Sequence, residues 1–204
     1  MPNTILFNRK AFVAVIPIVL ILLTSTSCGL DPQAVAMKKL KKQNIRVSSQ
    51  NLFKAIEMGD VKNTFLLLEA GIDINVYVDN KTPLIAAIES GKQKVVDHLL
   101  SKWVPDVTMK QNNGRTALMV AVEKINSPLL VQLIDLGADI DAPLNDGTTP
   151  LMRAVLGDSY ELVDILLNSG ADPRLKSNNK ETALSIARDR DDEKLLRLLK
   201  KARS

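Results

Sequence analysis

Thr82-Pro83-Leu84-Ile85-Ala86-Ala87 is the stretch that decides the fold, because it recurs at a fixed interval. Three later copies begin at Thr116, Thr149 and Thr182, so the threonines stand 34, 33 and 33 residues apart. A repeat of this length is typical of solenoids built from stacked helical units. One unit cannot close a core by itself, so each must bury its apolar face against the next unit.

The same stretch predicts how each unit begins and ends its helices. The threonine hydroxyl can cap a helix N-terminus, and Pro83 suits the first helical position, where its missing N–H would be unpaired anyway. Leu84 and Ala87 are three residues apart and therefore share one face of the first helix. Glycine can stop a helix in the left-handed conformation. It follows the second helix in three units, at Gly71, Gly137 and Gly170.

These motifs together resemble ankyrin-repeat proteins. In that family T-P-L-H-x-A opens the first helix of a ~33-residue unit, and Gly-Ala-Asp follows the second helix. Here the second motif reads Gly71-Ile72-Asp73, Gly137-Ala138-Asp139 and Gly170-Ala171-Asp172. The resemblance covers residues 48–204 and implies an all-α ankyrin-repeat solenoid of about five helix–turn–helix units. Tight-turn dipeptides stand where the family has projecting hairpin loops, at Asn113-Gly114 and Asp146-Gly147.

Residues 1–27 are predicted to be a signal peptide of the lipoprotein type. Arg9 and Lys10 precede an uncharged run over 11–23, shorter than the ~20 apolar residues that span a bilayer. Small residues then lead to Cys28, the only cysteine of the chain. This arrangement resembles bacterial lipoprotein signals, and the resemblance implies lipidation of Cys28, although Ser25 stands where that family usually has leucine. Two alternatives are cleavage at another small residue and retention of the segment as an anchor.

Residues 28–47 are expected to form the anchor and a basic linker. Gly29, rather than aspartate, follows the cysteine, which in similar Gram-negative lipoproteins favours the outer membrane, facing the periplasm. Asp31-Pro32 is a helix start, and a thin apolar stripe would follow at Ala36, Leu40 and Val47. The lysines between 38 and 42 fit a solvated helix that shields the first repeat, or a contact with anionic lipid headgroups.

Composition and charge narrow the function classes. The chain is 46% hydrophobic but only 3% aromatic, as suits a core of aliphatic side chains in helical repeats. Removing Arg9 and Lys10 from the 27 basic residues leaves 25 against 23 acidic ones, so nothing favours nucleic acid. The single histidine, His98, has no Cys/His cluster or glycine-rich phosphate loop around it in the sequence. We expect no enzyme activity, no cofactor, no metal and no small-molecule substrate.

The ankyrin resemblance implies a protein partner instead. The leading hypothesis is a non-enzymatic adaptor, tethered in the bacterial cell envelope by the lipid anchor, that holds or masks a periplasmic protein. One alternative is an immunity protein that neutralises a secreted toxin. An alternative of another class is an accessory stress-protection protein, or an enzyme with an unrecognised site. Fold alone does not separate these hypotheses.

Partner contacts in ankyrin proteins usually come from hairpin tips and from the exposed side of the first helices, which together line a concave surface. Tyr77 and Leu144 are expected as anchors, because the tips are otherwise polar and neither is needed for a turn. Trp103 is expected to pack over the adjoining loop rather than to bind. The resemblance implies that the contacts are Tyr77, Asp79, Lys81, Glu89, Lys110, Asn112, Arg115, Glu123, Leu144, Asn145, Asp146, Lys176, Asn178 and Lys180.

Overall fold

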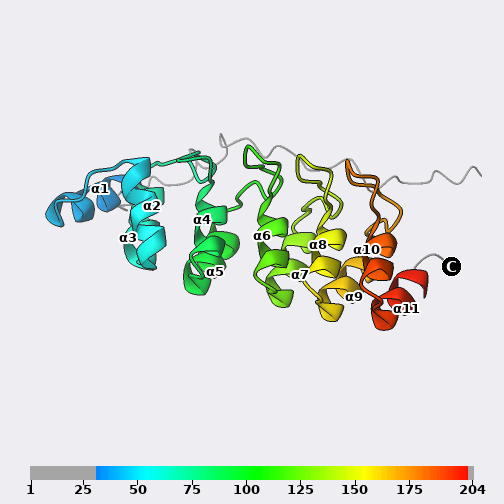
Figure 1. Ribbon diagram of the computed structural model, residues 1–204. Helices are drawn as coiled ribbons and strands as arrows, with labels where there is room; N and C mark the ends of the chain where they lie inside the picture. Colours follow the sequence, from blue (N-terminus) through cyan, green and yellow to red (C-terminus); the bar gives the residue numbers. More distant parts are fainter. Residues whose placement is uncertain (1–30, 202–204) are drawn as a thin grey trace, which may run out of the picture. The chain divides into compact units, whose positions relative to one another are not determined.

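The computed structural model describes residues 31–201, and these residues form eleven α-helices (Figure 1). The helices are α1 (Pro32–Lys42), α2 (Ser49–Met58), α3 (Val61–Glu69), α4 (Pro83–Glu89), α5 (Gln93–Lys102), α6 (Ala117–Glu123), α7 (Ser127–Asp135), α8 (Pro150–Leu156), α9 (Tyr160–Asn168), α10 (Ala183–Asp189) and α11 (Glu193–Lys201). Extended structure within 31–201 is limited to two isolated bridges, Val78 with Lys81 and Lys110 with Thr116.

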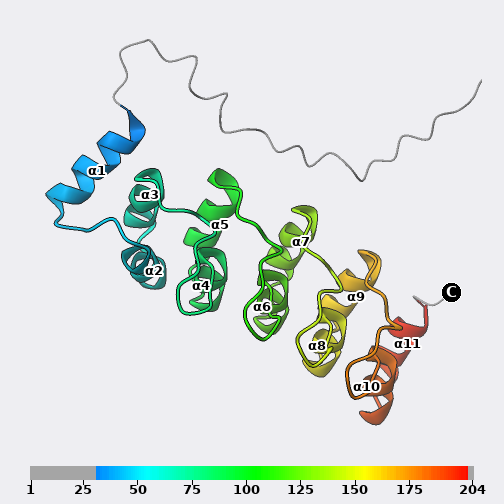
Figure 2. The same cartoon turned by 90° about the horizontal axis from the view of Figure 1, so that it is seen from above.

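Ten of these helices form five pairs, and the pairs stack in chain order. The first helices, α2, α4, α6, α8 and α10, make one row, and the second helices, α3, α5, α7, α9 and α11, make the other (Figure 2). The long loops between pairs project on one side of the stack (Figure 1). The predicted all-α solenoid of five units with projecting loops is therefore confirmed.

The threonine caps fix where four of the first helices begin. Each threonine hydroxyl accepts a hydrogen bond from the backbone N–H three residues later, at 3.1–3.3 Å. Pro83 and Pro150 occupy the first helical positions, as predicted. A cap of this kind contributes about 1 kcal/mol to stability, so the repeated threonine favours the same helix start in each of these four repeats. The capping residues are Thr82, Thr116, Thr149 and Thr182.

One continuous hydrophobic core runs through the stack. It extends from Ala36 in α1 to Leu199 in α11, and leucines from the repeated motif lie at its centre. Leu118 and Leu151 are 0% and 1% exposed, and Leu52 in the first pair is 0% exposed as well. Leu52 is therefore fully buried even though it belongs to the terminal repeat. This core lies within one compact unit, Pro32–Ser204.

Helix α1 covers the outer side of α3. Ala36 and Leu40 are fully buried there, and Gln33 donates a side-chain hydrogen bond to the Ala70 carbonyl at 3.1 Å. The expectation for Val47 was wrong, because its side chain is 42% exposed. Helix α1 ends at Lys42 and the backbone then turns at a left-handed Asn44 (φ 56), which takes Val47 off the helical face. None of the helices in 31–201 is long and apolar enough to cross a membrane.

Trp103 follows the second helix of its pair, where three other pairs have a left-handed glycine, at Gly71, Gly137 and Gly170. It follows α5 in an extended conformation, and its half-buried ring packs edge-on against Phe65 of α3, with 6.2 Å between the ring centroids. Packing over the adjoining loop was predicted for Trp103, but its ring contact is with Phe65 of a neighbouring helix. Phe65 also packs against His98, at 5.4 Å between centroids.

Candidate functional site

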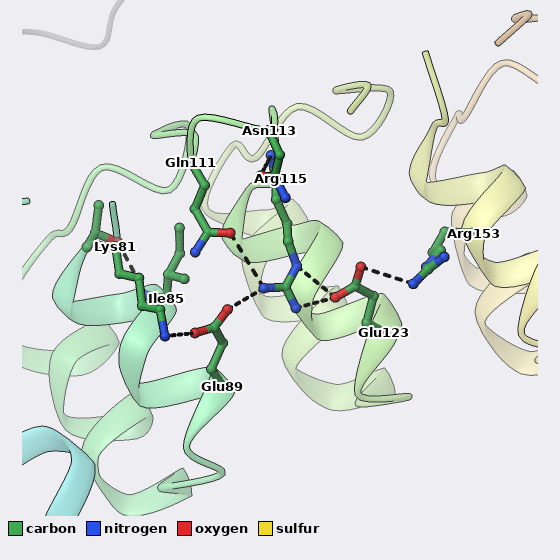
Figure 3. Close-up of polar contacts among 9 residues, drawn as sticks. Lys81, Ile85, Glu89, Gln111, Asn113, Arg115, Glu123 and Arg153 are labelled. Carbon is green, nitrogen blue, oxygen red and sulfur yellow. Dashed lines mark hydrogen bonds and ion pairs between the residues drawn. The ribbon is translucent and has the colours of Figure 1, made fainter. Parts of the chain in front are cut away.

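Five charged side chains form one continuous network along the exposed sides of α4, α6 and α8, which we call the first-helix face. Lys81 Nζ lies 2.7 Å from Glu89 Oε2, and Arg115 donates hydrogen bonds to both Glu89 and Glu123. Arg153 Nη2 completes the series at 3.5 Å from Glu123 Oε1. Figure 3 shows the alternation of cations and carboxylates across three repeats. We call these five residues the charged ladder.

The centre of the charged ladder is shielded from water and its ends are open. The side chains of Glu89, Arg115 and Glu123 are 18%, 20% and 17% exposed, whereas Lys81 and Arg153 are 39% and 46% exposed. Burial of the Glu89 carboxylate opposes its ionisation, but the hydrogen bonds and charges of Lys81 and Arg115 outweigh that effect and lower the pKa of Glu89 below its usual value. The Glu89 carboxylate is therefore negatively charged at neutral pH, between the two cations.

The repeat pattern explains the position of each member. Lys81 and Arg115 directly precede the capping threonines of two repeats, and Glu89 and Glu123 follow these threonines by seven residues. The stacking of the repeats places each carboxylate between two cations. In the next repeat Thr148 stands where a cation would be expected. Arg153 supplies the missing charge from the following helical turn.

Arg153 was not among the residues predicted from sequence. It occupies the position that holds the buried apolar residues Ala86, Val120 and Ile186 in the other repeats. A single charge in an otherwise apolar position was the sequence feature that could have identified it. Four predicted contacts, Lys81, Glu89, Arg115 and Glu123, are brought together by the structure in the same network.

A cavity of about 300 Å³ adjoins the end of the charged ladder, between the C-terminal ends of α6 and α8. Glu123 and Arg153 form its polar side. Ile125 and Leu156, which are 60% and 41% exposed, line it as well. An open hollow that combines apolar side chains with ionised groups is the usual composition of a recognition site.

Ile125 is held in a conformation that its side chain disfavours. Its φ angle is 52°, in the left-handed region, and β-branched residues rarely adopt that region. The equivalent position between the two helices of the other repeats holds a residue better suited to a positive φ. These equivalents are Gly59, Gly91, Asp158 and Asp191. Since strained residues are concentrated at functional sites, Ile125 belongs with the candidate site, although sequence analysis did not select it.

The asparagines at the predicted hairpin tips join consecutive loops. Asn145 donates a side-chain hydrogen bond to the Asn112 carbonyl at 2.8 Å, and Asn178 donates one to the Asn145 carbonyl at 3.0 Å. The Asn112 N–H in turn donates to the Asn80 side chain at 2.8 Å. The loops approach so closely that a Cβ on Gly147 would lie 2.8 Å from the Asn178 nitrogen. The three predicted tip asparagines thus have a structural role, which stacks the hairpins.

Of the remaining predicted tip residues, some stabilise or form turns and others are exposed to solvent. Tyr77 is 46% exposed, but its hydroxyl donates to the Lys110 carbonyl of the next loop at 2.8 Å. Leu144, the second predicted anchor, is half-buried, so only part of its side chain is accessible to a partner. Asp79 and Lys180 have left-handed turn conformations. Asp146 accepts a hydrogen bond from the Thr148 N–H at 2.8 Å, which lowers the pKa of Asp146, and Lys176 is exposed.

Two further predictions concern chemistry. His98 packs against Phe65, and no group of three or more His, Cys, Asp or Glu side chains within 31–201 could hold a metal ion.

Tyr160 connects two repeats, because its hydroxyl donates to Asp192 at 2.8 Å and the Lys194 ammonium lies 4.0 Å from its ring centroid. Cys28 lies outside the described residues, so its lipidation stays a prediction.

Comparison with known proteins agrees with this geometry. The family description "Ankyrin repeats (3 copies)" matches three overlapping stretches, at 52–143, 95–177 and 124–203. The chain belongs to the ankyrin-repeat family. Its repeats therefore form a protein-interaction module, on a fold that generally serves as a non-enzymatic scaffold.

Individual relatives match about half of this chain and a small part of their own length. The chain is similar to the 2-5A-dependent ribonuclease of Mus musculus, with 32% identity over 92 residues, 44% of this chain and 12% of that protein. It is also similar to neurogenic locus notch homolog protein 2 of Homo sapiens, with 30% identity over 105 residues, 50% of this chain and 4% of that protein. Since the chain spans a small part of each relative, their activities do not transfer to it.

Proposed function

We propose that this chain is a non-enzymatic binding module that holds one protein partner on its first-helix face. The observation that carries the proposal is the cavity beside Ile125, where exposed apolar side chains adjoin the charged ladder. A partner that fits would place an apolar side chain between Ile125 and Leu156. It would place a carboxylate near Arg153, whose side chain is 46% exposed and lies 3.5 Å from Glu123 Oε1.

The charged ladder supports this interface because its ion pairs hold the side chains in fixed positions before a partner binds. Arg115 is held by two carboxylates from neighbouring repeats, so its side chain loses little conformational freedom when a partner binds. The exposed ends of the ladder steer an approaching partner, while the strained Ile125 supplies apolar contact area. The hairpin tips form the edge of the surface, and their stacking hydrogen bonds keep it rigid.

Ile125→Asn tests this surface with a change that should not unfold the protein. Asparagine tolerates the left-handed region, so the variant is expected to gain about 1 kcal/mol of unfolding free energy. The loss of the apolar side chain is expected to weaken partner binding at least about tenfold. Unfolding is followed in urea, and binding is followed by affinity capture from envelope extract with residues 31–204 as bait.

The matched control is Val131→Asn, which changes an exposed β-branched residue on the second helix α7. A partner of the first-helix face is retained by the wild type and by the Val131 variant, and is lost by the Ile125 variant. Loss from the Val131 variant alone would place the interface on the second helices. That result would contradict the proposal.

We further propose that Cys28 is acylated and tethers the module in the bacterial envelope, as an outer-membrane lipoprotein facing the periplasm. The support is the sequence pattern around that cysteine. The wild type is expected in the membrane fraction, because two or more acyl chains make release negligible. Cys28→Ala is expected to give a soluble form or an unprocessed precursor, as measured by fractionation and metabolic labelling with palmitate. Wild-type protein found wholly in the soluble periplasmic fraction would exclude the tether.

A further inference from the structure

A larger cavity lies between α1, α3 and α5, on helices that do not contribute to the first-helix face. Its volume is about 680 Å³, within the range of sites for small ligands. No acidic side chain is among the residues that line it. Four lysines contributed by three helices surround it, Lys39, Lys42, Lys62 and Lys102.

These four ammonium groups have no acidic partner among residues 31–201. None of them takes part in an ion pair within residues 31–201. The Lys102 ammonium lies instead over the Phe65 ring, 4.8 Å from its centroid. Like charges gathered around a hollow with low-dielectric walls attract an anion and raise its local concentration. The charge of the cavity therefore favours an anionic ligand.

The walls beneath the lysines are apolar. Val61, Phe65 and Leu66 of α3 line the cavity, and the Phe65 ring is held edge-on by both His98 and Trp103. His98 also lines the cavity. Its Nε2 atom is buried and has no hydrogen-bond partner among the described residues. Apolar walls with cations around them are complementary to a molecule with a hydrocarbon chain and an anionic head.

We propose that this cavity binds an anionic phospholipid, with the headgroup phosphate among the lysines and the start of one acyl chain against Phe65. An acidic peptide would satisfy the charges but would leave the apolar wall without a matching group. Lysine clusters on a helix, as on α1, are a usual means of recognising anionic lipid. The proposal depends on the cavity alone, and neither on the partner of the first-helix face nor on acylation of Cys28.

The experiment uses residues 31–204, which contain the whole described core but not Cys28. Vesicles of phosphatidylcholine are compared with vesicles that also contain phosphatidylglycerol. Binding is measured by co-sedimentation and by the emission of Trp103, the only tryptophan of the chain, whose ring contacts Phe65. We expect binding and an emission shift with phosphatidylglycerol only. Lys39→Glu/Lys62→Glu should weaken binding at least about tenfold, since each lysine near an anionic surface contributes about fivefold.

Lys38→Glu/Lys41→Glu is the matched control. It makes the same charge change with two exposed lysines of α1 that do not line the cavity. An equal loss in both double variants would show general attraction between α1 and a charged surface, which would overturn the proposal. An equal Trp103 response to inorganic phosphate alone would overturn it too, because the acyl chain would then contribute nothing. Binding of polyglutamate without any response to phosphatidylglycerol would favour an acidic protein segment and reject the lipid.

Discussion

Leu118→Ala is expected to lower the unfolding free energy by about 2–5 kcal/mol. Leu118 is fully buried in the first turn of α6, which packs between α4 and α8 and against α7. The substitution removes apolar contacts with several helices and leaves a cavity that the stacked repeats can fill only by shifting together. Urea denaturation of residues 31–204, followed by circular dichroism, measures the loss.

Leu136→Ala provides the same chemical change at a leucine that is 44% exposed. It is expected to change stability by no more than about 0.5 kcal/mol, as for most surface substitutions. Leu52→Ala should behave like Leu118→Ala rather than like this control, since Leu52 is also fully buried. A small loss at Leu118 would contradict a continuous core through the stack.

Arg115→Met should cost about 1–3 kcal/mol at neutral pH, although it keeps most of the aliphatic side chain. The guanidinium lies between Glu89 and Glu123, whose side chains are less than one fifth exposed. Its removal leaves two partly desolvated carboxylates close together, each with one remaining cation. This expected loss of unfolding free energy is smaller than the 3–5 kcal/mol typical of a fully buried ion pair, because some water reaches the charged ladder. Arg197→Met, at an ion pair 80% exposed on both sides, should have little effect.

The Arg115→Met penalty is expected to depend on pH. In the wild type the folded-state pKa of Glu89 lies below its ordinary value of 4.5. The ion pairs of Glu89 therefore stabilise the fold above that pH, and the contribution is lost as the pH falls through the folded value. The stability difference between wild type and variant should be full at pH 7 and should shrink as the pH falls below 4.5 and through the lowered folded-state pKa of Glu89. A difference that stays constant from pH 7 to the most acidic pH at which both proteins remain folded would show that the lost packing of Arg115, rather than its charge, causes the effect.

The structure brings together some of the residues that sequence analysis selected for the candidate site, and it adds two that sequence analysis did not select. Glu89, Arg115 and Glu123 were selected because the repeat places them on the exposed side of the first helices or at the hairpins, and the structure joins them in one network. Arg153 and Ile125 were missed, because each is an exception within its repeat position. The tip asparagines fit the expected pattern as well, but they hold neighbouring loops together. The pattern alone does not separate that role from partner binding.

The sequence by itself determined the period, the all-α architecture and the residues at which the first helices start. These features depend on short-range interactions, namely threonine caps, proline at the first helical position and apolar residues on one helical face. Only the tertiary structure decided which charges meet, because Arg115 reaches Glu89 from 26 positions away through the stacking of two repeats. The same stacking produced the strained, exposed Ile125 beside a cavity and gathered four lysines from α1, α3 and α5 around a second one. Such arrangements result from long-range packing, and short-range propensities do not specify them.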